Sequence, residues 1–491
     1  MSLLPPPQRA VFAWLQRIAP TWPTLAFFDA TGCKPGVLNT WTIAALGCRR
    51  ALRVHSGYIW HTEQALCWQK TAAATPQSVQ QSLRQFLSAC KKPSLQKPEH
   101  LPPWPLQRGA WLYLGYEAAP WFDSAILAPP QPASTPDLLC VEPSAWLIQH
   151  KPTGQWQVVA AESDRIRQVS GQFEAFLTDH NFADGQSSEP STKAWHAQGL
   201  EASLSPEAFS AQVASLQQAI ARGETYQANL SIRFQTALTL QEHPLRLLQA
   251  LCLRNPSPFS GMIQTPDFTL LSNSPERLVS VSPSGVIESR PIAGTRGRGD
   301  ADVSDDALGE RLRGNLKEQA EHSMLVDLIR NDLGRVATAG SVHVSELMTL
   351  ERYSHVTHLV SNVVGQRAPS KDAVDVMQAF FPGATITGCP KLRTMALLQQ
   401  AEPVPRGFYT GSMGYVCADT GALDLNILIR SLMLTPPKGS QSKAKPAPSY
   451  EYQASFHAGA GIVADSVAQY EYRECLRKAQ ILMAVLGISP Q

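Results

Sequence analysis

Two pairs of glutamates are the residues in this sequence whose types and spacing most clearly suggest chemistry. Glu318 and Glu321 are three residues apart in KEQAEH, and Glu471 and Glu474 are three residues apart in EYREC. Leucines and alanines recur at helical spacing around both pairs, so each pair is predicted to project from one face of a helix. If the two helices face each other, four carboxylates converge and repel one another unless protons or a cation intervene. Mg²⁺ fits best because it binds carboxylate oxygens and keeps water and substrate oxygens, although spacing alone also fits two solvated helix faces.

The composition narrows the class of protein that must position these residues. The chain has 491 residues, 44% hydrophobic and 17% charged, which is typical of a soluble globular protein. Its 42 basic and 40 acidic residues are mixed along the chain. The sequence therefore shows no cluster of basic residues of the kind that a nucleic-acid-binding protein needs. No apolar run is long enough to span a membrane. Nine cysteines without a C-x-x-C pair, and an N-terminus unlike a signal peptide, predict a cytoplasmic protein with reduced thiols.

The chain is predicted to divide into an N-terminal segment, a linker and a larger C-terminal part. Residues 1–183 are rich in tryptophan and contain proline-rich connections, whereas residues 184–199 are polar and read as a linker. Residues 200–491 contain most of the recognisable elements, and the basic Pro/Ser-rich stretch at 436–449 is predicted to be a mobile loop. Two strands, in FYTGSMGYVCAD and LDLNILIRSLMLT, are predicted to pair across a tight turn at Thr420–Gly421.

Nine short strings follow one another between residues 274 and 479. In chain order they are SPERL (274–278), SRPIAGTRGRG (289–299), KEQAEHSMLVDLIRNDLGRV (317–336), RYSHVTHLVS (352–361), FPGATITGCPK (381–391), GSMGY (411–415), ILIRS (427–431), AGAGIVADS (458–466) and YRECLRKA (472–479). In this order they resemble the chorismate-utilising enzymes. The resemblance implies an α+β fold in which two large, mainly antiparallel β-sheets pack face to face and are covered by helices. It also implies that residues 1–183 join this fold as the N-terminal segment of a component I protein, and that residues 200–491 form the chorismate-binding catalytic domain.

The resemblance gives the glutamates separate roles toward Mg²⁺, the implied cofactor. It implies that Glu321 and Glu474 bind the metal directly, while Glu318 and Glu471 hold its water molecules. Lys478 follows Glu474 by one helical turn. It is placed to contact the substrate carboxylate that the metal would bind, or to balance the charge of the acidic cluster. Without the motif, Lys478 would be read as an exposed helix lysine.

Chorismate, the implied substrate, is a dianion, and several residues are implied to bind it. Tyr415 and Arg430 are expected on adjacent strands, both on the enolpyruvyl carboxylate, because a guanidinium binds carboxylates through two parallel hydrogen bonds. Small residues are expected to let the ligand approach the main chain. They are Gly459, Ala460 and Gly461 in AGAGIV, with Gly294 and Thr295 in PIAGT as the facing wall.

Two further residues are implied to act on the ring of the substrate. Glu276 in SPER is implied to be the general acid for the C4 hydroxyl, a role that needs a carboxyl kept protonated by a partly apolar site. His358 in THLVS is implied to lie beside the reacting ring. Without the motif, a histidine in such an apolar segment would be read as a core residue.

Two positions bear on the reaction within the family. Gln227 occupies the place where water-adding members carry a lysine base, so ammonia rather than water is the expected nucleophile. Ala293 stands where many aminodeoxychorismate synthases carry a lysine that attacks the ring, and anthranilate synthases carry alanine there. The strings YQANL, SNSPERLVS and TITGCPK resemble aminodeoxychorismate synthases instead. The tryptophan feedback string L-L-E-S of anthranilate synthases has no clear copy, and AFFDATG (26–32) is the closest segment.

The function that this resemblance favours is amination of chorismate to 4-amino-4-deoxychorismate. Synthesis of anthranilate by an anthranilate synthase component I stays open as the alternative. So does a catalytically silent homologue that binds chorismate or tryptophan as a regulatory subunit. The sequence contains no glutaminase signature, neither a nucleophile turn of the form G-x-C-x-G nor a downstream His-x-Glu pair. A separate glutamine amidotransferase subunit is therefore expected to supply the ammonia.

Overall fold

The structure is a computed structural model of the chain and describes ten stretches of it. These are residues 6–31, 40–63, 67–90, 106, 108–126, 133–179, 194–297, 316–352, 356–437 and 450–488. Within these stretches, the description covers the backbone but not the side chains of residues 6–10, 30–31, 179, 293–297, 316–318, 321, 352 and 356–358.

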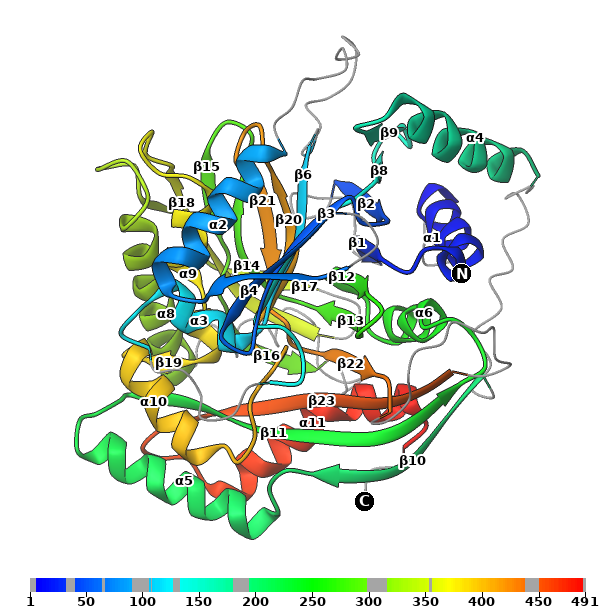
Figure 1. Cartoon of the computed structure of the whole chain (residues 1–491). Helices are drawn as coiled ribbons and strands as arrows, with labels where there is room; N and C mark the ends of the chain where they lie inside the picture. The colour runs from blue at the N-terminus through cyan, green and yellow to red at the C-terminus, as the bar shows by residue number, and fades with distance from the viewer. Residues whose placement is uncertain are drawn as a thin grey trace.

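Two large antiparallel β-sheets form the body of the molecule (Figure 1). The first sheet has 11 strands in the order β10 (Trp195–Ala202), β11 (Gln227–Leu240), β23 (Tyr450–Ile462), β22 (Ser431–Thr435), β13 (Thr269–Ser274), β12 (Ser257–Gln264), β1 (Leu25–Thr31), β2 (Trp41–Leu46), β8 (Ala145–His150) and β9 (Trp156–Ala160), with β19 (Gly388–Cys389) paired to β11. The second has 12 strands in the order β16 (Ile292–Gly297), β18 (Val356–Gln366), β15 (Val286–Ser289), β14 (Arg277–Val281), β21 (Leu423–Asn426), β20 (Ser412–Cys417), β6 (Gly109–Leu114), β7 (Leu138–Glu142), β3 (Arg50–His55), β4 (Tyr58–Glu63) and β5 (Gln69–Ala73), with β17 (His343–Arg352) paired to β18.

Three apolar clusters show that the sheets pack face to face and that helices cover their outer faces. The cluster between the sheets joins Ala26 and Leu270 of the first sheet to Trp111 and Tyr113 of the second. The outer face of the first sheet packs against α1 (Pro6–Ile18), α4 (Ser163–Asp179), α5 (Pro206–Ala221), α6 (Leu245–Arg254) and α11 (Ala468–Leu486). The outer face of the second packs against α2 (Pro76–Ala89), α3 (Ala119–Phe122), α8 (Leu316–Gly334) and α9 (Ala373–Phe380), while α10 (Lys391–Ala401) contributes to both outer clusters. The predicted fold class is therefore confirmed.

Local sequence explains where these elements begin and end. The Ser205 hydroxyl accepts a hydrogen bond from the Ala208 N–H at 3.2 Å and caps α5, with a proline in its first turn. Helix α11 ends at Gly487, whose φ of 75° is a left-handed conformation that favours glycine. Strand β6 is buried along its whole length because helices and the other sheet cover its two faces, and this explains the continuous apolar run GAWLYL.

The chain changes sheets at two places that matter for the site. Strand β13 lies in the first sheet and β14 in the second, so the chain crosses at residues 275–276. Strand β21 lies in the second sheet and β22 in the first, so it crosses back at residues 427–430. The prediction that LDLNILIRSLMLT is one strand paired with FYTGSMGYVCAD is therefore wrong beyond Asn426. Apolar side chains at the crossing are buried on both sides of the second sheet, and this burial produces the uninterrupted apolar pattern.

Two segment predictions can be compared with the described residues. The last residues of the predicted linker at 184–199 belong to β10, which begins at Trp195 and pairs with β11, so the linker is shorter than predicted. Trp195 is buried and its indole N–H donates to the carbonyl of Val485 at 2.8 Å, which holds this strand in place. Residues 438–449 of the predicted mobile loop lie outside the described residues. The domain boundaries themselves stay a prediction.

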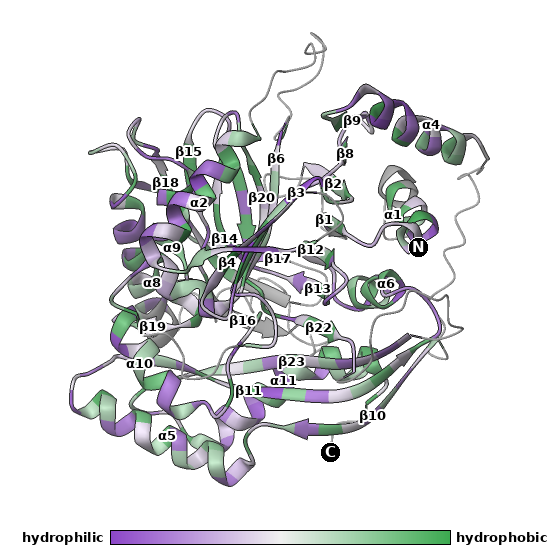
Figure 2. Ribbon diagram, in the orientation of Figure 1, coloured by the Kyte–Doolittle hydropathy of each residue, from purple (hydrophilic) through white to green (hydrophobic). Residues whose placement is uncertain are grey.

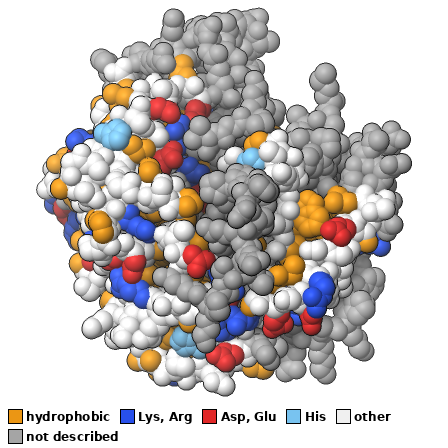
Figure 3. Space-filling model, turned by 90° about the horizontal axis from the view of Figure 1, so that it is seen from above, with side chains coloured by type: hydrophobic (Ala, Val, Ile, Leu, Met, Phe, Trp, Pro, Cys, Tyr) orange, Lys and Arg blue, Asp and Glu red, His pale blue; other side chains and the backbone are white. Residues whose placement is uncertain are grey.

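The distribution of polar residues agrees with this layered core. Figure 2 shows apolar colouring along the central strands and mixed colouring along the covering helices. Figure 3, which views the molecule from above, shows basic and acidic side chains interspersed on the described surface. Of the helices described, none combines the length and apolarity needed to cross a membrane.

Candidate active site

The two crossings between the sheets bring Glu276 and Arg430 to one place. The Ile427 N–H donates to the carbonyl of Glu276 at 3.0 Å, and the Asn273 N–H donates to the carbonyl of Arg430 at 3.3 Å. Arg430 has a φ of 50°, an unusual conformation for a residue with a side chain. Such backbone outliers concentrate at functional sites, where the surrounding structure holds them.

The environment of Glu276 favours its protonated form. Its side chain is 7% exposed, and burial raises its pKa to about 7. The Thr385 hydroxyl, the Lys478 ammonium and the Arg430 guanidinium oppose this rise but do not cancel it. A carboxyl with a pKa near neutrality can donate a proton to a leaving hydroxyl, so the expected role of Glu276 as a general acid agrees with its surroundings.

Arg430 lies close to both a second arginine and Glu276. Burial and the neighbouring Arg477 lower its pKa, whereas the charge of Glu276 raises it. Arg430 forms no ion pair with any residue that the structure describes. A partly buried guanidinium without an ion-pair partner is available to bind an anionic ligand.

Helix α11 places the second glutamate pair beside this pocket. The Glu474 carboxylate accepts two hydrogen bonds from Arg477, both 2.8 Å long, and lies 3.6 Å from the Lys478 ammonium. The Lys478 ammonium also donates to the carbonyl of Gly459 at 2.9 Å, so α11 is tied to β23. The Glu471 carboxylate accepts a hydrogen bond from the Ser466 hydroxyl at 2.8 Å. In this arrangement the two carboxylates lie three residues apart at the start of α11 and offer hard oxygen ligands.

The first glutamate pair is only partly described. Glu318 and Glu321 lie on α8 as predicted, but their side chains are outside the described residues. His322, next to Glu321, is buried, and its Nε2 lies 2.6 Å from the Ser361 hydroxyl on β18. The side chains that are described contain no group of three or more His, Cys, Asp or Glu residues arranged to hold a metal. The four-carboxylate cluster therefore stays a prediction.

The glycines of β23 make room for side chains of the chain itself. A Cβ on Gly459 would lie 2.8 Å from the Tyr409 hydroxyl and 3.0 Å from the amide oxygen of Asn229. A Cβ on Gly461 would lie 2.6 Å from Nε2 of Gln227. Gln227, at the start of β11, thus lies against the glycine-containing strand that was expected to bind substrate. Ala460 lies between the two glycines and pairs with Leu230 of β11.

The expectation that Tyr415 and Arg430 lie on adjacent strands is wrong, whereas the role of Tyr415 toward the substrate stays a prediction. Tyr415 belongs to β20 of the second sheet and lines a separate cavity of about 100 Å³ with Phe28, Asp29 and Asp424. Arg430 precedes β22 of the first sheet, so the two residues are not on adjacent strands. The error follows directly from reading LDLNILIRSLMLT as one strand.

Tyr409 is the tyrosine that lies beside the glycines of β23, and sequence reasoning missed it. Its ring stacks on His457, with centroids 5.0 Å apart and planes 8° apart. It is 4% exposed, and burial raises its pKa, so its hydroxyl stays protonated. The string RGFYTG just before GSMGY was the available signal, because it places a tyrosine immediately before a strand of the predicted sheet.

The strands β16 and β18 bring Thr295 and His358 together. These residues are directly opposite each other in the strand register, and the register shifts between Ala293 and Thr295. Such a bulge bends a strand and redirects its side chains. The side chains of Gly294, Thr295 and His358 lie outside the described residues, so their orientation toward Glu276 stays a prediction.

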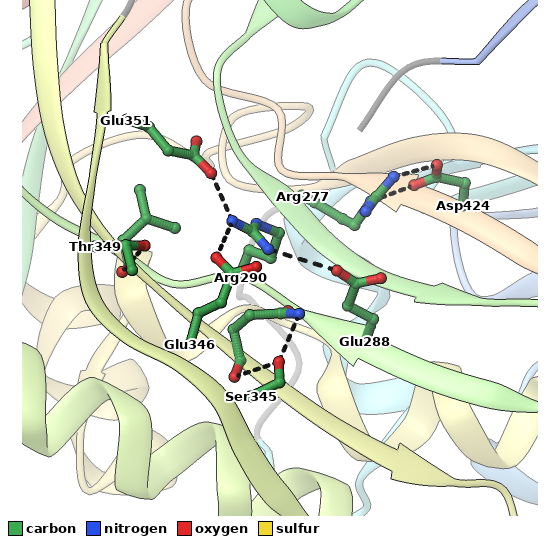
Figure 4. Close-up of polar contacts among 10 residues, drawn as sticks. Arg277, Glu288, Arg290, Ser345, Glu346, Thr349, Glu351 and Asp424 are labelled. Atoms are coloured by element: carbon green, nitrogen blue, oxygen red, sulfur yellow. Dashed lines mark hydrogen bonds and ion pairs between the residues drawn. The ribbon is translucent and has the colours of Figure 1, made fainter. Parts of the chain in front are cut away.

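A cluster of charged residues joins the segment before β16 to β17. The Arg290 guanidinium donates to Glu346 at 2.9 Å and to Glu351 at 2.5 Å, both on β17 (Figure 4). Glu351 is opposite His358 in the register of β17 and β18. Figure 4 also shows the paired contact between Arg277 and Asp424, which joins β14 to β21 with N–O distances of 2.9 and 2.8 Å. In each of these pairs a buried arginine binds a more exposed carboxylate, and the pairs join the strands that carry the candidate site.

Comparison with known proteins agrees with this fold and with these motifs. The family model described as chorismate binding enzyme matches residues 50–484. The chain is 38% identical over 396 residues to aminodeoxychorismate synthase component 1 of Bacillus subtilis (strain 168), which covers 78% of each protein. It is 33% identical over 454 residues to anthranilate synthase component 1 of Thermus thermophilus, covering 92% of this chain and 90% of that protein. The crystal structure of anthranilate synthase component I from Streptococcus pneumoniae superimposes with a TM-score of 0.70 at 26% identity, covering 91% of this chain and 93% of that chain.

Proposed function

Because the chain belongs to the chorismate binding enzyme family, we propose that it aminates chorismate to 4-amino-4-deoxychorismate, the precursor of para-aminobenzoate in folate biosynthesis. The observation that carries this proposal is the convergence of Glu276, Arg430 and Lys478 where the chain crosses between its two sheets. A dianionic substrate needs cations, and a departing hydroxyl needs a proton donor. These three residues provide both.

In the proposed reaction the chain binds chorismate and moves one proton. The guanidinium of Arg430 binds the enolpyruvyl carboxylate, and main-chain N–H groups of residues 459–461 assist it. Glu276 donates its proton as the C4–O bond breaks, so the hydroxyl leaves as water. Ammonia forms the new C4–N bond, and its surplus proton returns to the Glu276 carboxylate. Gln227 cannot act as a base for water, and this favours ammonia as the nucleophile.

The residues of α11 fit the magnesium ion that the family implies. Glu471 and Glu474 provide oxygen ligands beside the Lys478–Gly459 contact. We expect Glu474 and Glu321 to hold Mg²⁺ directly, and Glu471 and Glu318 to hold its waters. When bound, the ion neutralises the ring carboxylate and acts as a Lewis acid for loss of the C4 oxygen.

Anthranilate synthesis is the second candidate, and Ala293 favours it. Alanine at this position cannot form the covalent lysine adduct that many aminodeoxychorismate synthases use. Under the main proposal, ammonia must therefore reach C4 without that adduct.

A separate glutamine amidotransferase is the proposed source of ammonia. The purified chain is expected to use ammonium salts, with a rate that follows the neutral NH₃ fraction between pH 7 and 9, and not to use glutamine. Adding the amidotransferase is expected to restore the use of glutamine and to flatten the pH dependence. Turnover of glutamine by the purified single chain would refute the two-subunit proposal.

A further inference from the structure

A second cavity lies away from Glu276, between α10 and the 3-10 helix Tyr116–Ala118. Its volume is about 220 Å³. Its walls are largely apolar and include Pro120, Ile126, Leu392, Met395 and Val404. Leu392 is 42% exposed, so the cavity opens to solvent. Walls of this kind suit the apolar part of a small ligand.

Two residues that line this cavity each carry a buried oxygen atom that has no hydrogen-bond partner among the residues that the structure describes. These atoms are Oε2 of Glu117 and the hydroxyl of Tyr116. Glu117 is 6% exposed, and the main-chain N–H groups of Glu117 itself, Gly407 and Arg406 stabilise its carboxylate. The carboxylate is therefore fixed in place while one oxygen stays unused. Buried polar atoms are normally hydrogen-bonded, so two such atoms on neighbouring residues of a cavity wall point to a ligand that binds there.

The nearby arginine does not neutralise Glu117. The Arg406 guanidinium donates to both carboxylate oxygens of Glu402 at 2.8 Å, to the Thr410 hydroxyl at 3.1 Å and to the carbonyl of Asn229 at 2.6 Å. Arg406 is thus fully engaged in an ion pair with Glu402. The charge of Glu117 is left without a cationic partner.

The rest of the cavity is also unfavourable to an anion. Leu398 and Gln399, in the last turn of α10, line it, and the C-terminal end of a helix carries partial negative charge. Burial raises the pKa of Glu117 to about 7, which reflects the cost of ionising it without a partner. A cationic ligand would offset this cost, whereas a carboxylate ligand would add to it.

We propose that this cavity binds a small primary ammonium compound with an apolar chain. Its N–H groups donate to Oε2 of Glu117 and to the Tyr116 oxygen, and its chain packs against the apolar walls. A cavity of about 220 Å³ is large enough for a chain of a few carbons. Chorismate, a dianion, is excluded from this site by its charge. The proposal does not depend on the proposed amination.

Calorimetric titration of the full chain with n-butylamine tests the proposal directly. We expect saturable binding of one molecule, with n-butanol and butyrate binding at least tenfold more weakly because they lack the positive charge. Ammonium chloride is expected to bind more weakly as well, since each buried methylene strengthens binding about fourfold. Absence of saturable binding, or equal binding of butanol or ammonium, would overturn the proposal. These comparisons use the unaltered protein and do not depend on how a variant folds.

Three variants locate the binding. Glu117→Gln removes the charge but keeps the shape, and we expect at least tenfold weaker binding of n-butylamine. Tyr116→Phe keeps the ring against Arg406 and is expected to weaken binding severalfold. Asp123→Asn is the matched control, because Asp123 is the carboxylate at the end of α3 and does not line the cavity. Unchanged binding in Glu117→Gln, or an equal loss in Asp123→Asn, would contradict the assignment of this site.

Discussion

The main-chain N–H of Ile427 donates to the carbonyl of Glu276 at 3.0 Å and joins the two segments in which the chain changes sheets. Each segment carries one charged residue of the candidate site, Glu276 in the first and Arg430 in the second. Because the crossings are bound to each other, the carboxyl and the guanidinium are positioned by the main chain of two packed sheets. Short segments that are held at both ends by packed sheets position catalytic groups more accurately than free loops do.

Replacing Arg430 tests the binding of substrate. Arg430→Lys is expected to weaken chorismate binding by about 10- to 100-fold, because an ammonium cannot form the two parallel hydrogen bonds of a guanidinium. Calorimetric or fluorescence titration with chorismate measures the loss. Arg393→Lys, at an exposed arginine paired with Glu224, is the control and should bind normally. Unchanged affinity in Arg430→Lys would remove this residue from the substrate site.

The raised pKa of Glu276 predicts opposite effects on activity and on stability. The folded-state pKa of about 7 exceeds the reference value of 4.5, so the folded protein binds more protons than the unfolded chain between these values. The free energy of unfolding should therefore fall as the pH rises through this window. Glu276→Gln should remove this loss and stabilise the protein at pH 8 by up to roughly 3 kcal/mol, with little effect at pH 4.

Glu276→Gln should also lower the turnover rate by about 100- to 10,000-fold, because the proton donor is gone. Chemical denaturation at the two pH values and steady-state rates on one preparation provide the measurements. Glu162→Gln, at an exposed glutamate, should change neither quantity by much. A variant at Glu276 that is active, or one that is equally destabilised at both pH values, is not compatible with a buried general acid.

The two tyrosines can be distinguished by the same substitution at each. Tyr409→Phe removes the hydroxyl that lies beside Gly459 and should lower kcat/KM for chorismate about tenfold. Tyr415→Phe, in the separate cavity with Asp29, should leave it unchanged. The reverse order would restore the original prediction from the sequence that Tyr415 binds the substrate.

The metal site predicts a graded response among the glutamates. Glu474→Ala should abolish magnesium-dependent turnover because a direct ligand is lost. Glu471→Gln should reduce it by about 10- to 100-fold, as expected when a group that holds a metal-bound water is changed. Activity is measured across a titration of Mg²⁺ after treatment with EDTA. Full activity of Glu474→Ala at saturating Mg²⁺ would exclude this residue as a ligand.

The sequence motifs identified several residues of the candidate site because the motifs are local. SPERL and ILIRS gave Glu276 and Arg430, and YRECLRKA gave Lys478 on a helix beside them. The motifs could not show that the chain changes sheets at residues 427–430, because an apolar run looks the same in a strand and in a buried crossing. Because of that error, the sequence analysis placed Tyr415 on a strand next to Arg430 and overlooked Tyr409. The sequence also could not show that Glu117 lines a cavity, because the other wall of that cavity is formed by the distant residues of α10.

The product formed from chorismate, Mg²⁺ and ammonium salts by the purified chain tests the central claim most directly. Mass spectrometry and a pyruvate assay distinguish the two candidate reactions, because aminodeoxychorismate retains the enolpyruvyl group whereas anthranilate formation releases pyruvate. The proposed function predicts aminodeoxychorismate without pyruvate, and its conversion to para-aminobenzoate by a separate lyase. Stoichiometric release of pyruvate with anthranilate would contradict it.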